Sequence, residues 1–202
     1  MLEIVVATRN QGKLKEFKQL IQGLPIKLYS LDDFTEIPEI AETGSTFQEN
    51  ALLKARIVSQ TTGLVTLADD SGLEVDKLHG EPGIYSARYA GEPTNDQANN
   101  AKLLNKLQGI PLAERTARFR AVIAIYLPEG KYYFAEGSCA GLIGLEPKGN
   151  FGFGYDPLFI LPDLNKTMAE LALEEKNEFS HRAKAFRQSV AILEKIIDKT
   201  AK

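Results

Sequence analysis

The sequence predicts an α/β protein with a mixed sheet. In the first half of the chain, short apolar runs typical of buried strands alternate with segments of helical periodicity. Further along, two β-rich segments flank Pro128-Glu-Gly-Lys131, which is typical of an antiparallel hairpin. Because alternating strands and helices favour parallel pairing while a hairpin adds antiparallel strands, we expect a partly antiparallel sheet.

The first predicted elements are a strand, a tight loop and a helix. Residues Leu2 to Ala7 form an apolar, β-branched run, and the polar segment "TRNQGK" follows it. Apolar residues then recur at helical spacing until the helix stops at Gly23-Leu-Pro25.

A second helix and a second strand follow. Thr46 and Glu49 form a capping box, and apolar residues mark one face of the helix: Phe47, Ala51, Ala55 and Val58. The strand over Leu64–Ala68 ends in two adjacent aspartates, Asp69 and Asp70, followed by Ser-Gly. Because Asp, Ser and Gly are turn formers, we expect a turn there.

The second half of the chain adds the hairpin and three helices. The hairpin strands are expected over Phe119–Leu127 and Tyr132–Ala140. Asp96 is expected to cap a helix that carries Leu103, Leu104 and Leu107, and Thr167 with Glu170 predicts a short capped helix. Ser180 is expected to cap the last helix, whose apolar face comprises Ala183, Phe186, Val190, Leu193 and Ile197.

Composition excludes several classes of protein. The 202 residues carry a net charge of −3, which does not indicate a nucleic-acid binder. The only cysteine, Cys139, excludes an intrachain disulfide and fits a reducing compartment. Neither a signal peptide nor an apolar run of the roughly 18 residues needed to span a membrane is found, so we expect a cytoplasmic protein without membrane partners.

Two segments place cations where a helix begins. In "ATRNQGK", free backbone N–H groups and Lys13 would suit a phosphate, although solvated surface lysines are the plainer interpretation. In Ser180-His181-Arg182, two cationic side chains occupy a first helical turn, with Lys176 upstream. An anion opposite them would remove the electrostatic penalty, and the alternative is a pair of exposed polar residues.

The segment "GNFGFGYDPLF" (149–159) alternates glycines with Phe151, Phe153 and Tyr155. Glycines permit close backbone approach, aromatic rings offer stacking faces, and Asp156 would accept hydrogen bonds from a base edge. The alternative is a glycine-weakened strand that packs its aromatics into the core. Together with Asp69 and Asp70, which would suit Mg²⁺, these segments describe a nucleoside triphosphate site.

Five blocks resemble one enzyme family. They are "ATRNQGKLKEF", "ETGSTFQENALLKA", "ADDSGLEVDKLHGEPGIYSARYAG", "GFGYDPLF" and "EEKNEFSHRAKA", in this order from residue 7 to residue 187. In combination they resemble the non-canonical purine nucleoside triphosphate pyrophosphatases (inosine triphosphatases, XTP/dITP diphosphatases). The resemblance implies hydrolysis of ITP, dITP and XTP to the monophosphate and pyrophosphate. It also implies Mg²⁺ dependence, a homodimer, and one two-lobed α/β domain over residues 1–202 with a long mixed sheet and a cleft between the lobes.

The resemblance further implies roles for individual residues. The phosphate-binding segment falls on Thr8, Arg9, Asn10, Gln11, Gly12 and Lys13, with Arg9 departing from the family's frequent Gly, and Lys54 matches a lysine near the phosphates. The base-binding loop and other substrate contacts fall on Ser71, Phe153, Gly154, Tyr155, Asp156, Lys176, His181 and Arg182. His181 and Arg182 are candidate donors to the 6-oxo group of the base.

The implied catalytic centre is acidic. The proton acceptor matches Asp70, with Asp69 beside it as a partner in metal binding, and the metal-binding glutamate matches Glu42, although Glu39 and Glu49 lie close in sequence. We expect Mg²⁺ to bridge triphosphate oxygens while Asp70 directs a water at the α-phosphorus. Two other classes stay open, a pyrophosphatase for modified pyrimidine nucleotides and a catalytically silent nucleotide sensor.

Overall fold

The computed structural model describes residues 1–200, with side chains up to residue 196. It divides the chain into two compact units. Unit 1 comprises Met1–Asp70, Ala121–Gly137 and Arg182–Lys202, and unit 2 comprises Ser71–Arg120 and Ser138–His181. The interpretation of residues 1–202 as a single domain stays a prediction.

The described strands form a seven-stranded sheet in the order β2-β1-β3-β4-β5-β6-β7. Their bounds are β1 Leu2–Val6, β2 Ile26–Ser30, β3 Val65–Val75, β4 Thr116–Tyr126, β5 Tyr132–Ile143, β6 Phe159–Leu161 and β7 Lys166–Thr167. Strand β1 pairs in parallel with β2 and β3, whereas β6 pairs antiparallel with β5 and β7. The predicted mixed α/β sheet is therefore confirmed.

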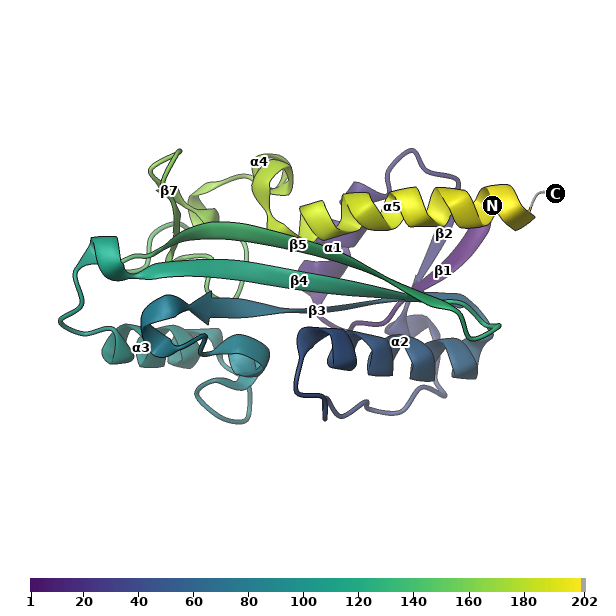
Figure 1. Cartoon of the computed structure of the whole chain (residues 1–202), viewed down its shortest axis with the longest axis horizontal. Coiled ribbons are helices and arrows are strands. Elements are labelled where there is room, and N and C mark those ends of the chain that lie inside the picture. Colours follow the sequence, from purple (N-terminus) through teal and green to yellow (C-terminus); the bar gives the residue numbers. More distant parts are fainter. Residues whose placement is uncertain (201–202) are drawn as a thin grey trace. The chain divides into compact units, whose positions relative to one another are not determined.

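Unit 1 has three layers, with its strands between two layers of helices (Figure 1). Side chains of the strands alternate between the two faces of the sheet, so each face can be covered by helices. Helices α1 (Gln11–Leu20) and α5 (His181–Thr200) cover one face, and α2 (Phe47–Thr62) covers the other. On the α1 and α5 face, strand residues such as Ile4, Val6 and Leu67 belong to one buried cluster with Phe17 and Phe186.

The three helices of unit 1 follow the predicted patterns. The α2 positions Phe47, Ala51, Ala55 and Val58 are all buried, as their spacing indicated. On α5, Ala183, Phe186 and Leu193 are buried and Val190 is partly buried. The side chain of Ile197, predicted on the same face, lies outside the described residues.

Unit 2 has its own hydrophobic core. Its elements are η2 (Asp76–Leu78), η3 (Gly83–Arg88), α3 (Asp96–Lys106), η4 (Leu112–Glu114), η5 (Met168–Glu170) and α4 (Leu173–Phe179), together with parts of β3, β4 and β5 and all of β6 and β7. The core cluster contains Leu73, Leu103, Tyr155 and Phe159. Arg115 is buried beside it, and each of the three guanidinium nitrogens donates to a carbonyl oxygen, so this buried charge is compensated by hydrogen bonds.

The predicted hairpin turn, the Thr46 cap and the Thr167–Glu170 capping box are confirmed, the Ser180 cap stays a prediction, and two other assignments are wrong. The hairpin closes where Leu127 N–H donates to the Lys131 carbonyl oxygen at 2.8 Å. Asp96 is not the cap of α3; Asn95 accepts the capping bond from Ala98 N–H, which frees the Asp96 carboxylate for another contact. The turn expected at Asp69–Asp70 is also wrong, because β3 continues through both residues to Val75.

The edge strand β2 had no counterpart among the predicted elements. It pairs with β1 alone, and four of its five residues are only partly buried. A short, half-buried edge strand lacks both the apolar run and the clear alternation by which a strand is predicted from sequence. No helix within residues 1–200 combines the length and the apolar character that a bilayer crossing requires.

Substitutions at two glycines of unit 2 distinguish the cost of backbone strain from the cost of steric contact. At Gly149 (φ +83°), an added Cβ would lie 2.2 Å from the Ala169 carbonyl oxygen, whereas at Gly109 (φ +79°) it would meet nothing within 4 Å. We expect Gly109→Ala to lower the free energy of unfolding by about 1 kcal/mol through strain alone. Gly149→Ala should lower it by about 3 kcal/mol or more, because overpacking is added. Urea unfolding measures both, and equal losses would contradict this assignment.

Candidate active site

The two adjacent aspartates lie within strand β3 and are nearly inaccessible to solvent, at 1% exposure for Asp69 and 5% for Asp70. Strand β1 ends at Val6, whose partner is Leu67, so both acids lie just past the end of the parallel pair. Because successive side chains of a strand point to opposite faces, Asp69 continues the Leu67 face and Asp70 the Ala68 face. The structure thus separates the two carboxylates, which the sequence placed together as partners at one metal.

Asp69 meets the cations of α1 and α5. Its Oδ2 lies 2.7 Å from Lys13 Nζ and 3.4 Å from Arg182 Nε, and the Arg182 guanidinium also pairs with Glu16. Burial would raise the pKa of Asp69, but the charges of Lys13 and Arg182 outweigh this effect and hold its pKa below the ordinary value. Asp69 is therefore a fixed negative charge that ties two helices to the strand.

Asp70 meets one cation from α2. Lys54 Nζ lies 3.5 Å from Asp70 Oδ1 and 2.7 Å from Glu42 Oε1, and it also donates to the Asp69 carbonyl oxygen. Burial raises the pKa of the Asp70 carboxyl, Lys54 offsets this only in part, and the nearby Glu42 raises it further. Although burial opposes it, the charges of Asp70 and Glu42 raise the pKa of Lys54, which stays protonated. Asp70 is thus the more easily protonated of the two aspartates.

The loop that carries Glu42 is fastened to the start of α2. Gly44 N–H donates to Asn50 Oδ1 at 2.7 Å, and a Cβ on Gly44 would lie 2.7 Å from that oxygen. Ser45 donates to Glu49 from both its N–H and its hydroxyl, so Glu49 serves the helix cap. Of the three glutamates considered, Glu42 alone has a described contact with Lys54, while Glu39 is exposed.

The segment Thr8–Lys13 forms the entry to α1. Asn10 is the helix cap and accepts from Lys13 N–H, and Thr8 Oγ1 accepts from Asn10 N–H. Arg9 and Gln11 lie on the exposed side, where both are near Asp32. Gly12 lies in the first turn. The anion predicted opposite Lys13 is present as Asp69, a group of the chain itself.

In unit 2, the segment 149–159 is a loop of turns and bends, not a strand, up to β6. Phe151 is 61% exposed and Phe153 is partly buried, whereas Tyr155 is buried and donates its hydroxyl to the Ser86 carbonyl oxygen. Burial raises the pKa of Tyr155, which keeps the hydroxyl protonated as a donor. The expectation that all three rings offer stacking faces is therefore wrong for Tyr155.

A buried ion pair organises the centre of this loop. Lys176 Nζ lies 2.7 Å from Asp156 Oδ2, which also accepts from Phe153 N–H, and the ammonium lies 5.0 Å from the Phe153 ring centroid. A Cβ at Gly152 would lie 2.1 Å from Asp156 Oδ2, so the glycine is required by this close approach. The carboxylate expected to meet a base edge is thus also a structural centre of the loop.

His181 and Arg182 are buried, so the interpretation of this pair as exposed polar residues is wrong. The His181 ring stacks on Phe119 with centroids 4.8 Å apart in unit 2. Arg182 belongs to unit 1, where its guanidinium pairs with Glu16 and Asp69, and its expected role as a donor to the base stays a prediction. Ser71, the first residue of unit 2, is partly buried.

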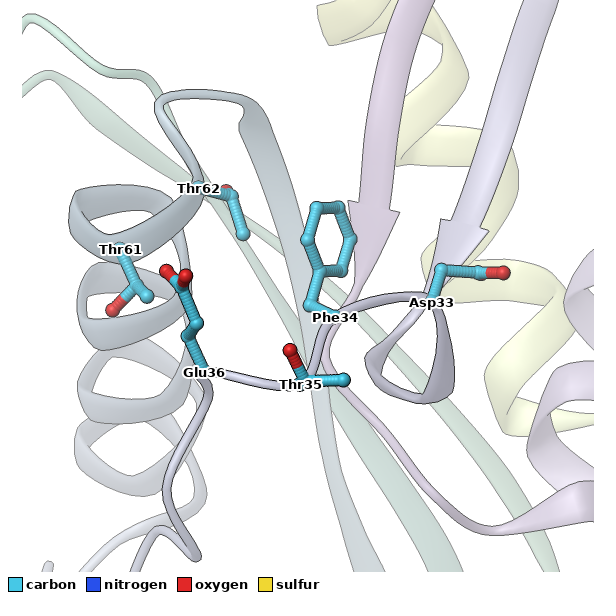
Figure 2. A pocket seen from close by; sticks show the side chains of 6 residues that line it. All are labelled: Asp33, Phe34, Thr35, Glu36, Thr61 and Thr62. Carbon is cyan, nitrogen blue, oxygen red and sulfur yellow. The ribbon is translucent and has the colours of Figure 1, made fainter.

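A separate pocket of about 250 Å³ lies in unit 1 beside the end of α2 (Figure 2). It is lined by Asp33, Phe34, Thr35, Glu36, Thr61 and Thr62. The Thr61 and Thr62 hydroxyls donate to carbonyl oxygens of their own helix, and the Asp33 carboxylate accepts from Ser30. An acidic lining at a helix C-terminus repels phosphates, so this pocket is not the candidate site.

Four residues with structural contacts in these units were not identified from the sequence. They are Glu16, Asn50, Asp96 as the acceptor of the Gly154 N–H, and Asn100 as a donor to the Gly154 carbonyl oxygen. Glu16 had a local signal, because it lies three positions after Lys13 on an otherwise basic helix segment. Asn50 binds Gly44, six residues before it, whereas Asp96 and Asn100 depend on contacts between distant segments and have no local signal.

The Glu16–Arg182–Asp69 arrangement yields a stability prediction. Arg182→Met leaves two buried carboxylates without this partner, so we expect it to lower the free energy of unfolding by about 3–5 kcal/mol. Adding Glu16→Gln should recover part of this loss, because one uncompensated charge disappears. Urea unfolding of both single variants and the double variant gives the coupling energy, and strictly additive losses would contradict the arrangement.

Comparisons with known proteins agree with this arrangement of elements. A family model described as the Ham1 family matches residues 4–192. The solved Ham1 protein of Coxiella burnetii has a TM-score of 0.88 and 43% identity, covering 96% of this chain and 100% of that one. The Ham1 protein of Staphylococcus aureus has a TM-score of 0.85 and 44% identity, covering 95% and 98%.

Curated relatives give the same result. A protein named dITP/XTP pyrophosphatase from Geobacter sulfurreducens is 55% identical over 185 residues, which is 92% of this chain and 93% of the relative. One of the same name from Bacillus subtilis is 50% identical over 196 residues, covering 96% and 98%. The length of the family match and these identities show that this chain belongs to the Ham1 family.

Proposed function

We propose that this chain hydrolyses ITP, dITP and XTP to the nucleoside monophosphate and pyrophosphate, and so cleanses the nucleotide pool of deaminated purines. Curated relatives at about half identity over nearly the whole chain are named dITP/XTP pyrophosphatases. The observation that carries the proposal is the environment of Asp69 and Asp70, two buried acids matched to cations from three helices.

Asp70 is the proton acceptor in this proposal. Its burial and the neighbouring Glu42 raise its pKa toward the operating pH, where a carboxylate is a more effective base. A water oxygen attacks the α-phosphorus, the bond to the oxygen that bridges the α- and β-phosphorus breaks, and pyrophosphate leaves. Asp70 orients that water and takes its proton, while Lys54 stabilises the developing negative charge.

Glu42 and Asp70 would hold Mg²⁺. Both carboxylates already face a single cationic group, Lys54 Nζ, so a second cation suits this side of the strand. Two carboxylates are sufficient for this ion, because Mg²⁺ usually takes one or two of them and completes its shell with substrate phosphates and water. When bound, the ion would neutralise charge on the triphosphate.

The segment Thr8–Lys13 would bind phosphate. The first-turn N–H groups of α1 carry positive partial charge, and Lys13 lies among them with 16% side-chain exposure. Asp69 holds Lys13 in place, so the lysine is ordered before any phosphate arrives. Asp69 acts as a positioning residue in this scheme.

The loop Phe153–Asp156 and Lys176 would recognise the base. Lys176 is a buried donor, and a donor facing the 6-oxo group of hypoxanthine or xanthine is left unpaired by the 6-amino group of adenine. Phe153, beside Lys176, offers a ring for stacking. Ser71 and His181 are proposed as further contacts from unit 2, and Arg182 acts through Asp69.

We further propose a cytoplasmic homodimer. The single cysteine, Cys139, is buried, and a chain with one cysteine forms no intrachain disulfide, which fits a reducing compartment. The dimer rests on the family resemblance alone, and sedimentation of the purified chain tests it.

Substrate profiling with product identification tests the function. With Mg²⁺, we expect ITP, XTP and dITP to give monophosphate and pyrophosphate at rates far above those for ATP, GTP and dUTP. Diphosphate plus orthophosphate would move the attack to the γ-phosphorus. Preference for dUTP would favour the pyrimidine class of pyrophosphatase, and tight binding without turnover would favour a nucleotide sensor.

The role of Asp70 is tested by Asp70→Asn. We expect kcat to fall by about 10²–10⁴-fold, because the proton acceptor is lost. The melting temperature should be unchanged or higher, because a desolvated carboxyl with a raised pKa is removed. Asp163→Asn, an exposed position, is the matched control and should leave both quantities unchanged. Turnover of Asp70→Asn near the wild-type rate would contradict the mechanism.

A further inference from the structure

We propose that Asp96 and Asn100 of α3 position the base-recognition loop and thereby set the affinity for the purine base, an inference that rests on the proposed function. Both side chains bind the same residue of that loop. Asp96 Oδ2 accepts from Gly154 N–H at 2.7 Å, and Asn100 Nδ2 donates to the Gly154 carbonyl oxygen at 2.9 Å.

The two bonds fix two consecutive peptide planes. The Gly154 N–H belongs to the peptide shared with Phe153, and its carbonyl belongs to the peptide shared with Tyr155. Gly154 has φ +62°, a left-handed conformation, and a Cβ there would meet nothing within 4 Å, so neighbouring atoms do not impose this conformation by packing. The hydrogen bonds from one turn of α3 therefore hold Gly154 itself, while the Phe153 N–H is held by Asp156 and the Tyr155 hydroxyl by Ser86.

The rest of α3 is anchored so that it can serve as a fixed support. Asn99 accepts from Ala90 N–H at 2.7 Å and donates to the Ala87 carbonyl oxygen at 2.9 Å. On the other side of the loop, the Tyr155 hydroxyl donates to Ser86, the residue next to Ala87. The loop is thus held at Gly154 and Tyr155 by two segments that Asn99 joins to each other.

Capping of α3 does not explain this pair. Asp96 is exposed, and the capping role at α3 belongs to Asn95, so a carboxylate at position 96 is not needed to begin the helix. Asn100 is buried, and its Oδ1 has no hydrogen-bond partner among the described residues, which costs free energy. Both side chains instead have one described role in common, the orientation of Gly154.

Phe153 is the residue through which this orientation would reach a ligand. Its N–H donates to Asp156, and its ring lies beside Lys176, the proposed donor to the base. Rotation of the Phe153–Gly154 peptide would move the Phe153 ring together with the Phe153 N–H that donates to the Asp156 carboxylate. Asp96 and Asn100 would therefore change binding of the base without touching it, and they would leave phosphate binding in unit 1 unchanged.

Binding of two product fragments tests this inference. Isothermal titration would measure Kd for dIMP, which carries the base, and for inorganic pyrophosphate with Mg²⁺, which does not. We expect Asp96→Ala and Asn100→Ala each to weaken dIMP binding by about tenfold, as for the loss of a charge-assisted or buried hydrogen bond. The Kd for pyrophosphate should stay within about twofold, and KM for dITP should rise more than kcat falls.

Conservative variants and a control separate positioning from a general loss of structure. Asp96→Asn retains an acceptor oxygen and should restore most of the dIMP affinity, whereas Asn100→Asp places an acceptor against the Gly154 carbonyl and should not. Asn105→Ala, an exposed position on the same helix, should behave as wild type.

Three results would overturn the inference. Unchanged dIMP affinity in Asp96→Ala and Asn100→Ala would show that the two side chains do not act on the base. Equal losses for dIMP and pyrophosphate would show a general structural effect. If the wild-type chain binds dIMP no better than dAMP, the proposed base recognition itself fails, and that result is visible before any variant is compared.

Discussion

The structure depends on the alternation of side chains in one strand. Asp69 and Asp70 are consecutive in β3, and the period of a strand sends their carboxylates to opposite faces. Asp69 faces α1 and α5 and is neutralised by Lys13 and Arg182, whereas Asp70 faces α2 and shares Lys54 with Glu42. Two like charges are tolerated side by side because each carboxylate has its own ion-pair partners at short range.

Because their environments differ, the two aspartates have different roles. Asp69 carries a lowered pKa and ties helices to the sheet, so it stabilises unit 1 and holds Lys13 in place. Asp70 carries a raised pKa, which is unfavourable for its charged form and favourable for accepting a proton. In the proposed mechanism, stability and chemistry would therefore come from neighbouring residues, and the cations that pair with them come from helices far apart in the sequence.

The sequence predicted the elements better than the contacts between them. Helical spacing located α1, and spacing with the Thr46 cap located α2, because these signals are local. A double aspartate followed by Ser-Gly has the composition of a turn, but pairing within the sheet overrides that local preference and continues β3 to Val75. Arg182 pairs with Glu16 and Asp69, and pairings over such sequence separations leave no local pattern. The contact of Asn100 with Gly154 was not predicted, because these residues are also far apart in the sequence.

A carbon-13 NMR titration of the aspartate carboxyl groups would test the different environments of Asp69 and Asp70 most directly. The two signals would be assigned by comparison with Asp69→Asn and Asp70→Asn, over the pH range in which circular dichroism shows a folded protein. The account predicts that Asp70 titrates above the ordinary value of 3.8 and that Asp69 is still ionised below it. Titration of both groups at one ordinary pKa, or in the opposite order, would contradict it.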